Sequence, residues 1–296
     1  MESRKVLNGK IIAEELNQAL KEEILKFTSK YKKPKPKLAT ILVGCNPASK
    51  IYVKIKFNTS KKVGIKSKIF HIREMEDSSI TLKKILRLIN YLNNNPRYHG
   101  ILLQLPLPES INEYTREIIN QINPIKDVDG LHQLNQGKLF NYDETYAPCT
   151  PKGIITMLEQ NNIPIEGQNV VIINRSDLVG KPLIFLLLKR NATVTVCHSK
   201  TRNLSEITKT ADILIVAIGK AKFIKSNMIK KGAVIIDVGI SKINGKIYGD
   251  VDFDEVYDKC SAITPCIGGI GPLTVHFLLR NTFSAYKNQI IGKTSQ

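Results

Sequence analysis

The stretch Leu38-Ala39-Thr40-Ile41-Leu42-Val43-Gly44 decides the fold, together with the segment Ala48–Lys56 that follows it. An apolar run that ends at a glycine is typical of a buried strand followed by a tight turn and a helix. On that helix Tyr52 and Lys56 are four residues apart, so they lie on one face. Such a pair is most often a solvated helix flank. An aromatic ring beside an amine also suits a site that holds a flat substrate and moves a proton.

The next long apolar run has a polar residue at its end. After a strand expected at 67–72 and a helix at 79–92, the run Tyr98–Pro108 indicates a strand buried on both faces, hence parallel and covered by helices. Gln104 lies at the carboxyl end of this strand, where open α/β sheets bind their ligands. Tyr52 and Lys56 also follow the carboxyl end of a strand. We therefore expect the three side chains to share one edge of a sheet.

A second strand–turn–helix unit begins the second half of the chain. The strand 168–173 leads into the polar turn 174–182 and an apolar helix, which is the first unit of a dinucleotide-binding fold, although the turn lacks the Gly-x-Gly-x-x-Gly pattern. After the next strand, an NAD site usually carries an acidic residue that binds the ribose. This chain has Ser199 and Lys200 there, with Arg175 in the preceding turn. These donors suit a 2′-phosphate, so the sequence predicts NADP rather than NAD.

Two further segments are candidates for ligand binding. Lys126-Asp127-Val128-Asp129-Gly130 is either a polar turn that caps a helix or a source of carboxylates for the N–H groups of a heterocycle. Strands expected at 213–217, 234–238 and 262–264 lead to Pro265-Cys266-Ile267-Gly268-Gly269-Ile270-Gly271-Pro272-Leu273-Thr274. Glycines at this density allow the backbone to approach a ligand closely.

The order of these segments predicts an α/β protein of two domains, as its 296 residues also favour. We expect an N-terminal α/β domain with parallel strands at residues 1–148 and a C-terminal Rossmann-like dinucleotide-binding domain at 149–280, with a cleft between them. A C-terminal helix at 281–296 is expected to pack back onto the first domain.

Composition narrows the function classes. The formal charge of +18 is compatible with nucleic-acid binding, but the lysines are spread along the chain, only 6% of residues are aromatic, and no nucleic-acid motif is present. Nucleic-acid binding therefore remains a minority alternative. The five cysteines are scattered without a Cys-x-x-Cys pair, which predicts reduced thiols in the cytoplasm and no metal site. No segment has the length and hydropathy of a signal peptide or a membrane span.

Taken together, the segments resemble the family of bifunctional methylenetetrahydrofolate dehydrogenase/methenyltetrahydrofolate cyclohydrolases. The resemblance rests on segments in the same order along nearly the whole chain: Val43-Gly44 with Ser49, Tyr52 and Lys56; Gly100–Pro108; Lys126–Gly130; Pro148–Gly153; Arg175–Pro182; Asp237–Ile240; and Thr264–Thr274. It implies oxidation of 5,10-methylenetetrahydrofolate by NADP⁺, then hydrolysis of the methenyl product to 10-formyltetrahydrofolate. It also implies folate substrates that can be polyglutamylated and a cytosolic homodimer.

The resemblance also implies a role for each matching residue. In the folate-binding half, Lys56 resembles the catalytic amine of the hydrolytic step, Gln104 its hydrogen-bonded partner and Tyr52 the ring that stacks on the folate. Further substrate-binding positions are Ser49, Asp129, Gly271 and Pro272. Positions that match cofactor contacts are Asn174, Arg175, Ser176, Ser199 and Ile240.

Three positions depart from the family pattern. Asn174 replaces a glycine, and asparagine tolerates positive φ better than most residues, so the turn is expected to survive. Ile267 replaces a proline in the glycine-rich loop, and Asn58 replaces a lysine two residues beyond Lys56. A related two-domain dehydrogenase that acts on another substrate, such as a shikimate- or amino-acid-type enzyme, remains an alternative because it would share the second half.

Overall fold

The computed structural model describes residues 5–291 and divides the chain into two compact units. Unit 1 holds residues up to Glu15 and Leu139–Phe277, and unit 2 holds Leu16–Lys138 and the chain from Leu278 onward. The predicted domain 1–148 thus has residues 139–148 in the unit that contains the second half. Residues 292–296 of the predicted C-terminal helix lie outside the described residues.

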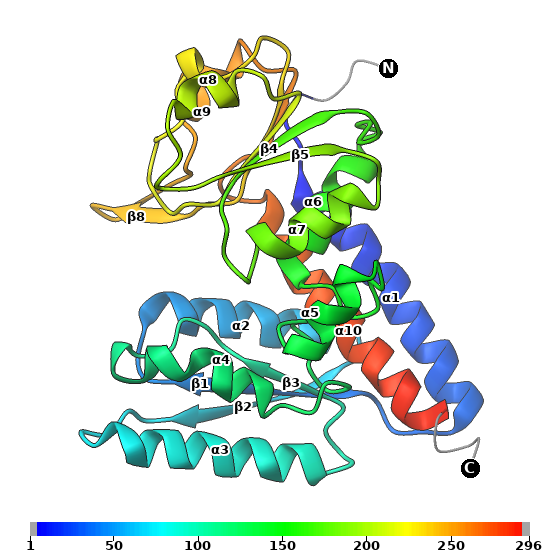
Figure 1. Ribbon diagram of the computed structural model, residues 1–296. Coiled ribbons are helices and arrows are strands. Elements are labelled where there is room, and N and C mark those ends of the chain that lie inside the picture. The colour runs from blue at the N-terminus through cyan, green and yellow to red at the C-terminus, as the bar shows by residue number, and fades with distance from the viewer. Residues whose placement is uncertain (1–4, 292–296) are drawn as a thin grey trace. The chain divides into compact units, whose positions relative to one another are not determined.

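Unit 2 is built on a three-stranded parallel sheet with the order β2-β1-β3. Helices α2 and α3 lie on opposite faces of this sheet (Figure 1). The elements that begin in this unit are β1 (Lys37–Val43), α2 (Pro47–Lys62), β2 (Lys66–Ile72), α3 (Ser78–Asn94), β3 (Gly100–Leu103), a 3₁₀-helix (Glu109–Tyr114), α4 (Thr115–Asn120) and α5 (Gln133–Phe140). The core includes aliphatic side chains from β1, α3 and β3. Ile41, Ile85 and Ile101 are examples, and each of these three is at most 1% exposed.

Two long helices belong partly to each unit: α1 (Gly9–Tyr31) and α10 (Ile270–Ile291). Within unit 2 their aromatic side chains pack together, with Phe27 against Phe283 and Tyr286 at centroid distances of 5.7 and 5.6 Å. The Tyr286 hydroxyl donates to the Pro34 carbonyl over 2.8 Å. These contacts hold the second half of α10 against α1 and against the segment before β1.

Unit 1 contains a five-stranded parallel sheet with the order β10-β7-β6-β4-β5. Its elements are α6 (Cys149–Gln160), β4 (Asn169–Ile173), α7 (Gly180–Leu188), β5 (Thr193–Cys197), α8 (Leu204–Thr208), β6 (Ile213–Val216), a 3₁₀-helix (Ser226–Met228), β7 (Val234–Asp237), the hairpin strands β8 (Ser241–Ile243) and β9 (Lys246–Tyr248), α9 (Phe253–Tyr257) and β10 (Ala262–Ile263). The central strands β6 and β7 are buried along their whole length, as expected for a sheet covered on both faces.

Two local predictions were wrong. The sequence after Pro108 predicts one helix near 109–122. The structure has a 3₁₀-helix followed by α4, because the Thr115 hydroxyl donates to the Asn112 carbonyl at the junction. Thr150 followed by Pro151 predicts a helix at 152–160 with Thr150 as its cap, but Thr150 does not cap α6. The helix already begins at Cys149, and the Thr150 hydroxyl lies 3.0 Å from that of Thr274.

The turn between α5 and α6 is fixed by one carboxylate. Glu144 pairs with Lys152, with Arg190 Nη1 at 2.8 Å and with Lys189 at 3.4 Å. Burial alone would raise the pKa of Glu144, but the hydrogen bonds from Arg190 and Lys152 outweigh it and lower the pKa to about 2. The ionised carboxylate therefore stabilises the folded chain.

We expect Glu144→Gln to lower the free energy of unfolding by about 2 kcal/mol at pH 7. The folded-state pKa lies below the ordinary value of 4.5, so this contribution is complete above about pH 5 and is lost as the pH falls toward 2. Denaturant unfolding of both proteins at several pH values measures it. Glu159→Gln, which removes only a half-exposed partner of Arg190, is the control and should cost less than about 1 kcal/mol. Equal losses in both variants, or a loss for Glu144→Gln that does not change with pH, would contradict the assignment.

Candidate functional site

A buried hydrogen bond in unit 2 joins Lys56 to Gln104. The Lys56 amine donates to Gln104 Oε1 over 3.0 Å, although the two residues are 48 positions apart in the chain. Gln104 Nε2 donates to the Leu105 carbonyl over 2.6 Å, so the amide orientation is fixed. Lys56 is 9% exposed and Gln104 is 8% exposed. Lys56 forms no ion pair with a carboxylate of the described residues, and a buried lysine that faces only a neutral amide is unusual for a purely structural role.

Local sequence places Lys56 in this position. Gly44 ends β1 in the left-handed region, with φ of 71°, and a side chain there would press on Pro108. Asn46 then caps α2, because its side chain accepts the Ser49 N–H over 3.0 Å. Gln104 extends β3, with its own N–H donating to the Ile41 carbonyl of β1. The helix after β1 and the residue after β3 therefore meet at the end of the sheet where the carboxyl ends of the parallel strands lie, as predicted.

Two more predicted residues lie on the face of α2 that carries Lys56. Tyr52 is one turn before Lys56 and is half-buried, and Ser49 is two turns before it and only 2% exposed. The Ser49 hydroxyl is buried without a hydrogen-bond partner among the described residues. Because an unpaired buried hydroxyl costs free energy, this atom is available for a ligand.

The turn 126–130 contains two residues with structural hydrogen bonds, Lys126 and Asp127, and the half-buried carboxylate of Asp129. The Lys126 amine donates to the carbonyls of Leu92, Asn93 and Asn95 and so caps the end of α3. The buried Asp127 accepts the N–H groups of Gly130 and His132 and the side-chain amide of Asn135, and burial raises its pKa. The structural alternative for this segment, a polar turn that caps a helix, therefore describes Lys126 and Asp127, although the sequence did not indicate these partners.

Asp129 differs from Lys126 and Asp127 in its hydrogen bonding. It is half-buried, and its carboxylate accepts no hydrogen bond from another described residue. Asp127 is paired with Ile101 of β3 in the parallel direction, so the chain continues from there toward the edge of the sheet that carries Gln104. This placement leaves the Asp129 carboxylate available to a ligand at that edge.

In unit 1, the candidate cofactor residues follow neighbouring strands. Ile173 of β4 pairs with Cys197 of β5, and Arg175 and Ser199 each lie two residues beyond that pair. Both side chains are exposed, and neither has a partner among the described residues. No acidic residue lies between 198 and 202. This donor set fits the 2′-phosphate of NADP.

Asn174 holds the turn in a way that the sequence did not indicate. It does not have positive φ. Its side-chain oxygen instead accepts the N–H groups of Ser176 and Gly180 over 2.8 and 2.9 Å, and its amide donates to the Ala217 carbonyl. The turn therefore survives the loss of glycine through side-chain hydrogen bonds rather than through backbone freedom.

The remaining predicted residues also lie in unit 1. Ile240 follows β7 and is 46% exposed. Gly271 and Pro272 are in the first turn of α10, and a Cβ on Gly271 would meet none of the described atoms within 4 Å. The substituted Ile267 is 71% exposed just before Gly268, whose φ is 85°. The glycine-rich segment thus forms an open turn at the start of α10.

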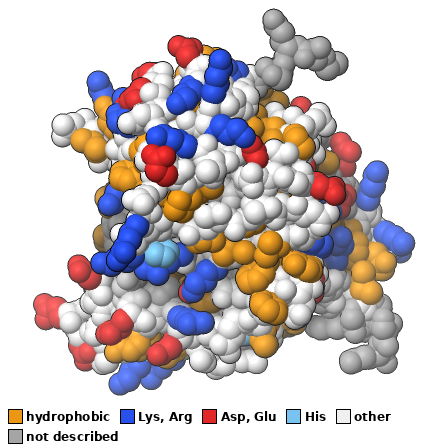
Figure 2. Space-filling model, turned by 45° about the horizontal axis from the view of Figure 1, so that its top comes forward, with side chains coloured by type: hydrophobic (Ala, Val, Ile, Leu, Met, Phe, Trp, Pro, Cys, Tyr) orange, Lys and Arg blue, Asp and Glu red, His pale blue; other side chains and the backbone are white. Residues whose placement is uncertain are grey.

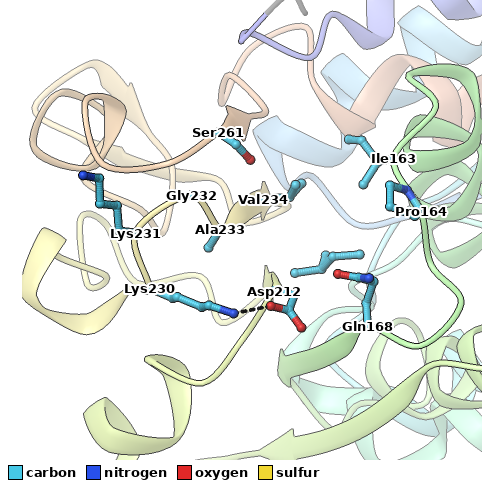
Figure 3. Close-up of a pocket in the computed structure, with 11 residues that line it drawn as sticks. Ile163, Pro164, Gln168, Asp212, Lys230, Lys231, Gly232, Ala233, Val234 and Ser261 are labelled. Carbon is cyan, nitrogen blue, oxygen red and sulfur yellow. Dashed lines mark hydrogen bonds and ion pairs between the residues drawn. The ribbon is translucent and has the colours of Figure 1, made fainter.

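A cavity of about 360 Å³ lies in unit 1, at the end of the five-stranded sheet opposite to the candidate cofactor residues (Figure 3). Ile213 and Val234, the first residues of β6 and β7, line it, so it lies at the amino ends of the strands. Its lysine Lys230 is already paired with Asp212. Since parallel sheets bind ligands at their carboxyl ends, this cavity is not the cofactor site.

Comparison with known proteins decides the family. A model described as "Tetrahydrofolate dehydrogenase/cyclohydrolase, catalytic domain" matches residues 7–129, and one described as "Tetrahydrofolate dehydrogenase/cyclohydrolase, NAD(P)-binding domain" matches residues 148–290. The chain belongs to the tetrahydrofolate dehydrogenase/cyclohydrolase family. The resemblance inferred from the sequence motifs is therefore confirmed, and with it the two-domain α/β fold class. Because the match includes the catalytic domain, the alternative of a dehydrogenase that shares only the second half is excluded.

Relatives in the tetrahydrofolate dehydrogenase/cyclohydrolase family match almost the whole chain. The bifunctional protein FolD of Oceanobacillus iheyensis is 50% identical over 283 residues, 95% of this chain and 96% of that protein. The crystal structure of the bifunctional enzyme from Campylobacter jejuni is 44% identical, with a TM-score of 0.90 over 96% of this chain and 98% of that one. The enzyme of Trypanosoma brucei, crystallised with NADP and an inhibitor, is 32% identical, with a TM-score of 0.89 over 96% and 97% of the two chains.

Two other expectations concern membrane-spanning helices and nucleic-acid binding. No helix among residues 5–291 is long and apolar enough to cross a membrane. On the face in Figure 2, Lys and Arg side chains are scattered among acidic and apolar ones and form no continuous stripe. This distribution gives the minority nucleic-acid hypothesis no support on that face.

Proposed function

We propose that this protein oxidises 5,10-methylenetetrahydrofolate with NADP⁺ and then hydrolyses the methenyl product to 10-formyltetrahydrofolate. The observation that carries the proposal is the buried Lys56–Gln104 pair within the matched catalytic domain, joined to a matched NAD(P)-binding domain. The two reactions share one substrate carbon, so a single folate site serves both.

The hydrolytic step depends on Lys56. Gln104 Oε1 fixes the direction of the Lys56 amine, and Lys56 Nζ removes a proton from the water that attacks the methenyl carbon. The hydroxyl formed on this carbon then loses its proton as the bond from the carbon to N5 breaks. N5 takes up one of the two water protons, the other is released to solvent, and the formyl group stays on N10. Tyr52 stacks on the folate ring, the Ser49 hydroxyl donates to it, and the Asp129 carboxylate accepts N–H groups of the pterin. Gly271 and Pro272 complete the substrate contacts.

NADP⁺, when bound, supplies the hydride acceptor for the first reaction. Arg175 and Ser199 hold the phosphate end, because both are exposed donors beyond the carboxyl ends of β4 and β5, and Ser176 contributes through the turn that it shares with Arg175. Asn174 keeps that turn in shape, and Ile240 contacts the nicotinamide end. We assign residues 1–148 to the folate-binding domain, 149–280 to the cofactor domain and the part of α10 from 281 to 291 to the former.

A spectrophotometric assay of the purified protein tests the function. We expect NADP⁺-dependent oxidation of methylenetetrahydrofolate, and decay of the methenyl absorbance when methenyltetrahydrofolate is supplied without cofactor. A folded protein that lacks both activities would refute the proposal. Retention of only one activity would show that Asn58, Asn174 or Ile267 has separated them.

Assembly and location belong to the same proposal. We propose a homodimer that acts in the cytoplasm on folates that can be polyglutamylated, in line with the family and with the five free cysteines. Light scattering would give twice the chain mass of 33.2 kDa for the dimer. A lower KM for polyglutamylated than for monoglutamylated substrate would support the substrate assignment.

A further inference from the structure

Two buried aspartates in unit 1 have no cation beside them. Asp250 is fully buried and Asp237 is 5% exposed, and no lysine or arginine among residues 5–291 forms an ion pair with either. Burial of a carboxylate costs free energy unless hydrogen bonds compensate it. Burial also raises the pKa of Asp237 to about 7. A pair retained at such a cost needs a reason beyond packing.

Among the described residues, the hydrogen-bond partners of the Asp250 carboxylate are all backbone amides. Asp250 Oδ2 accepts the N–H of Ile218 over 2.6 Å and that of Gly219 over 3.1 Å, and Oδ1 accepts the N–H of Lys220 over 2.7 Å. Residues 218–220 follow β6 at the carboxyl edge of the sheet. One carboxylate therefore fixes the whole turn after β6.

Asp237 does the same for the next strand. Its Oδ1 accepts the N–H groups of Gly239 and Asp250 over 3.2 and 3.0 Å, and its Oδ2 accepts that of Val251 over 3.0 Å. Its backbone N–H donates to the buried Thr264 hydroxyl, which begins the glycine-rich segment after β10. The two carboxylates thus connect the loops that follow β6, β7 and β10.

Two glycines leave the space that this arrangement needs. A Cβ on Gly239 would overlap the Asp250 carboxylate, and a Cβ on Gly249 would overlap that of Asp237. Ile240, the proposed nicotinamide contact, is the residue directly after Gly239. Its position therefore depends on both carboxylates.

We propose that Asp237 and Asp250 are positioning residues for the cofactor, which hold the turns at 218–220 and 239–240 in the conformation that binds NADP. The inference rests on the proposed function. It differs from a general stabilising role in one respect: hydrolysis of the methenyl substrate uses no cofactor, so the two activities should respond differently.

The test compares Asp250→Asn and Asp237→Asn with the wild type at pH 8, where Asp237 is ionised. We expect the KM for NADP⁺ to rise about tenfold or more in each variant, because charge-assisted hydrogen bonds to the turns are lost. Cofactor-free hydrolysis should stay within about twofold of wild type. Asp237→Asn removes a costly buried charge, so it keeps the proposal testable if Asp250→Asn does not fold.

Asp212→Asn is the matched control. Asp212 also accepts a backbone N–H, that of Asn169 over 3.0 Å, but it directly precedes β6 and so lies at the amino ends of the strands, beside the cavity in Figure 3. It should lower the thermal midpoint without changing the KM for NADP⁺. An unchanged KM in Asp250→Asn and Asp237→Asn, or a parallel loss of both activities in Asp237→Asn, would overturn the proposal. A wild type that lacks both activities would instead refute the proposed function.

Discussion

Lys56→Met is expected to abolish hydrolysis of methenyltetrahydrofolate, with a loss of at least about a hundredfold in kcat. Methionine has nearly the length of lysine and no proton to exchange, so it removes the chemistry and keeps most of the packing. The substitution leaves Gln104 Oε1 without its donor, which should cost about 1–3 kcal/mol of stability. Decay of the methenyl absorbance without NADP⁺ measures the rate, and circular dichroism confirms the fold.

Lys54→Met is the control for this prediction. Lys54 lies on the same helix, is exposed and forms no ion pair among the described residues, so hydrolysis should stay within about twofold of wild type. The oxidation reaction should fall less than hydrolysis in Lys56→Met, because the cofactor supplies the chemistry of that step. Full hydrolytic activity in folded Lys56→Met would show that another group moves the proton.

Sequence alone was sufficient for the features that depend on periodicity and strand order. Tyr52 and Lys56 share a helix face because of their spacing, and Gln104 joins them because carboxyl ends of parallel strands lie at one edge. These are properties of short segments and of a known topology. The common location of Lys56 and Gln104 was therefore predicted from these patterns, whereas the hydrogen bond between them was implied by the resemblance to the family.

Features that depend on long-range contacts were not predicted. Asp250 follows no motif that reveals its three amide partners thirty or more residues earlier in the chain, and the same is true of Lys126 and the end of α3. Asn174 was expected to resemble glycine in its backbone, whereas its side chain replaces the missing backbone freedom. In each of these cases the partners become adjacent only in the folded chain.

Arg175→Ala is expected to reduce selectivity for NADP over NAD by about ten- to a hundredfold. Arg175 is the exposed cation in the turn after β4, and the turn after the neighbouring β5 carries Ser199 and Lys200. A guanidinium that binds a phosphate contributes about 1.5–3 kcal/mol, and only NADP carries the 2′-phosphate. The KM for NADP⁺ should therefore rise, while the weaker reaction with NAD⁺ changes little. Steady-state oxidation of methylenetetrahydrofolate with each cofactor measures the ratio.

Ser199→Asp tests the same site from the opposite direction, because it introduces the acidic residue that binds ribose hydroxyls in NAD enzymes. It should weaken the binding of NADP⁺, because the new carboxylate repels the 2′-phosphate, and it should lower the KM for NAD⁺. Lys231→Ala is the control for lost positive charge, since Lys231 is exposed at the amino edge of the sheet and should leave both KM values unchanged. A wild-type preference for NAD⁺ would contradict the assignment. A similar rise in the KM for both cofactors in Arg175→Ala would instead show that Arg175 binds the pyrophosphate that they share.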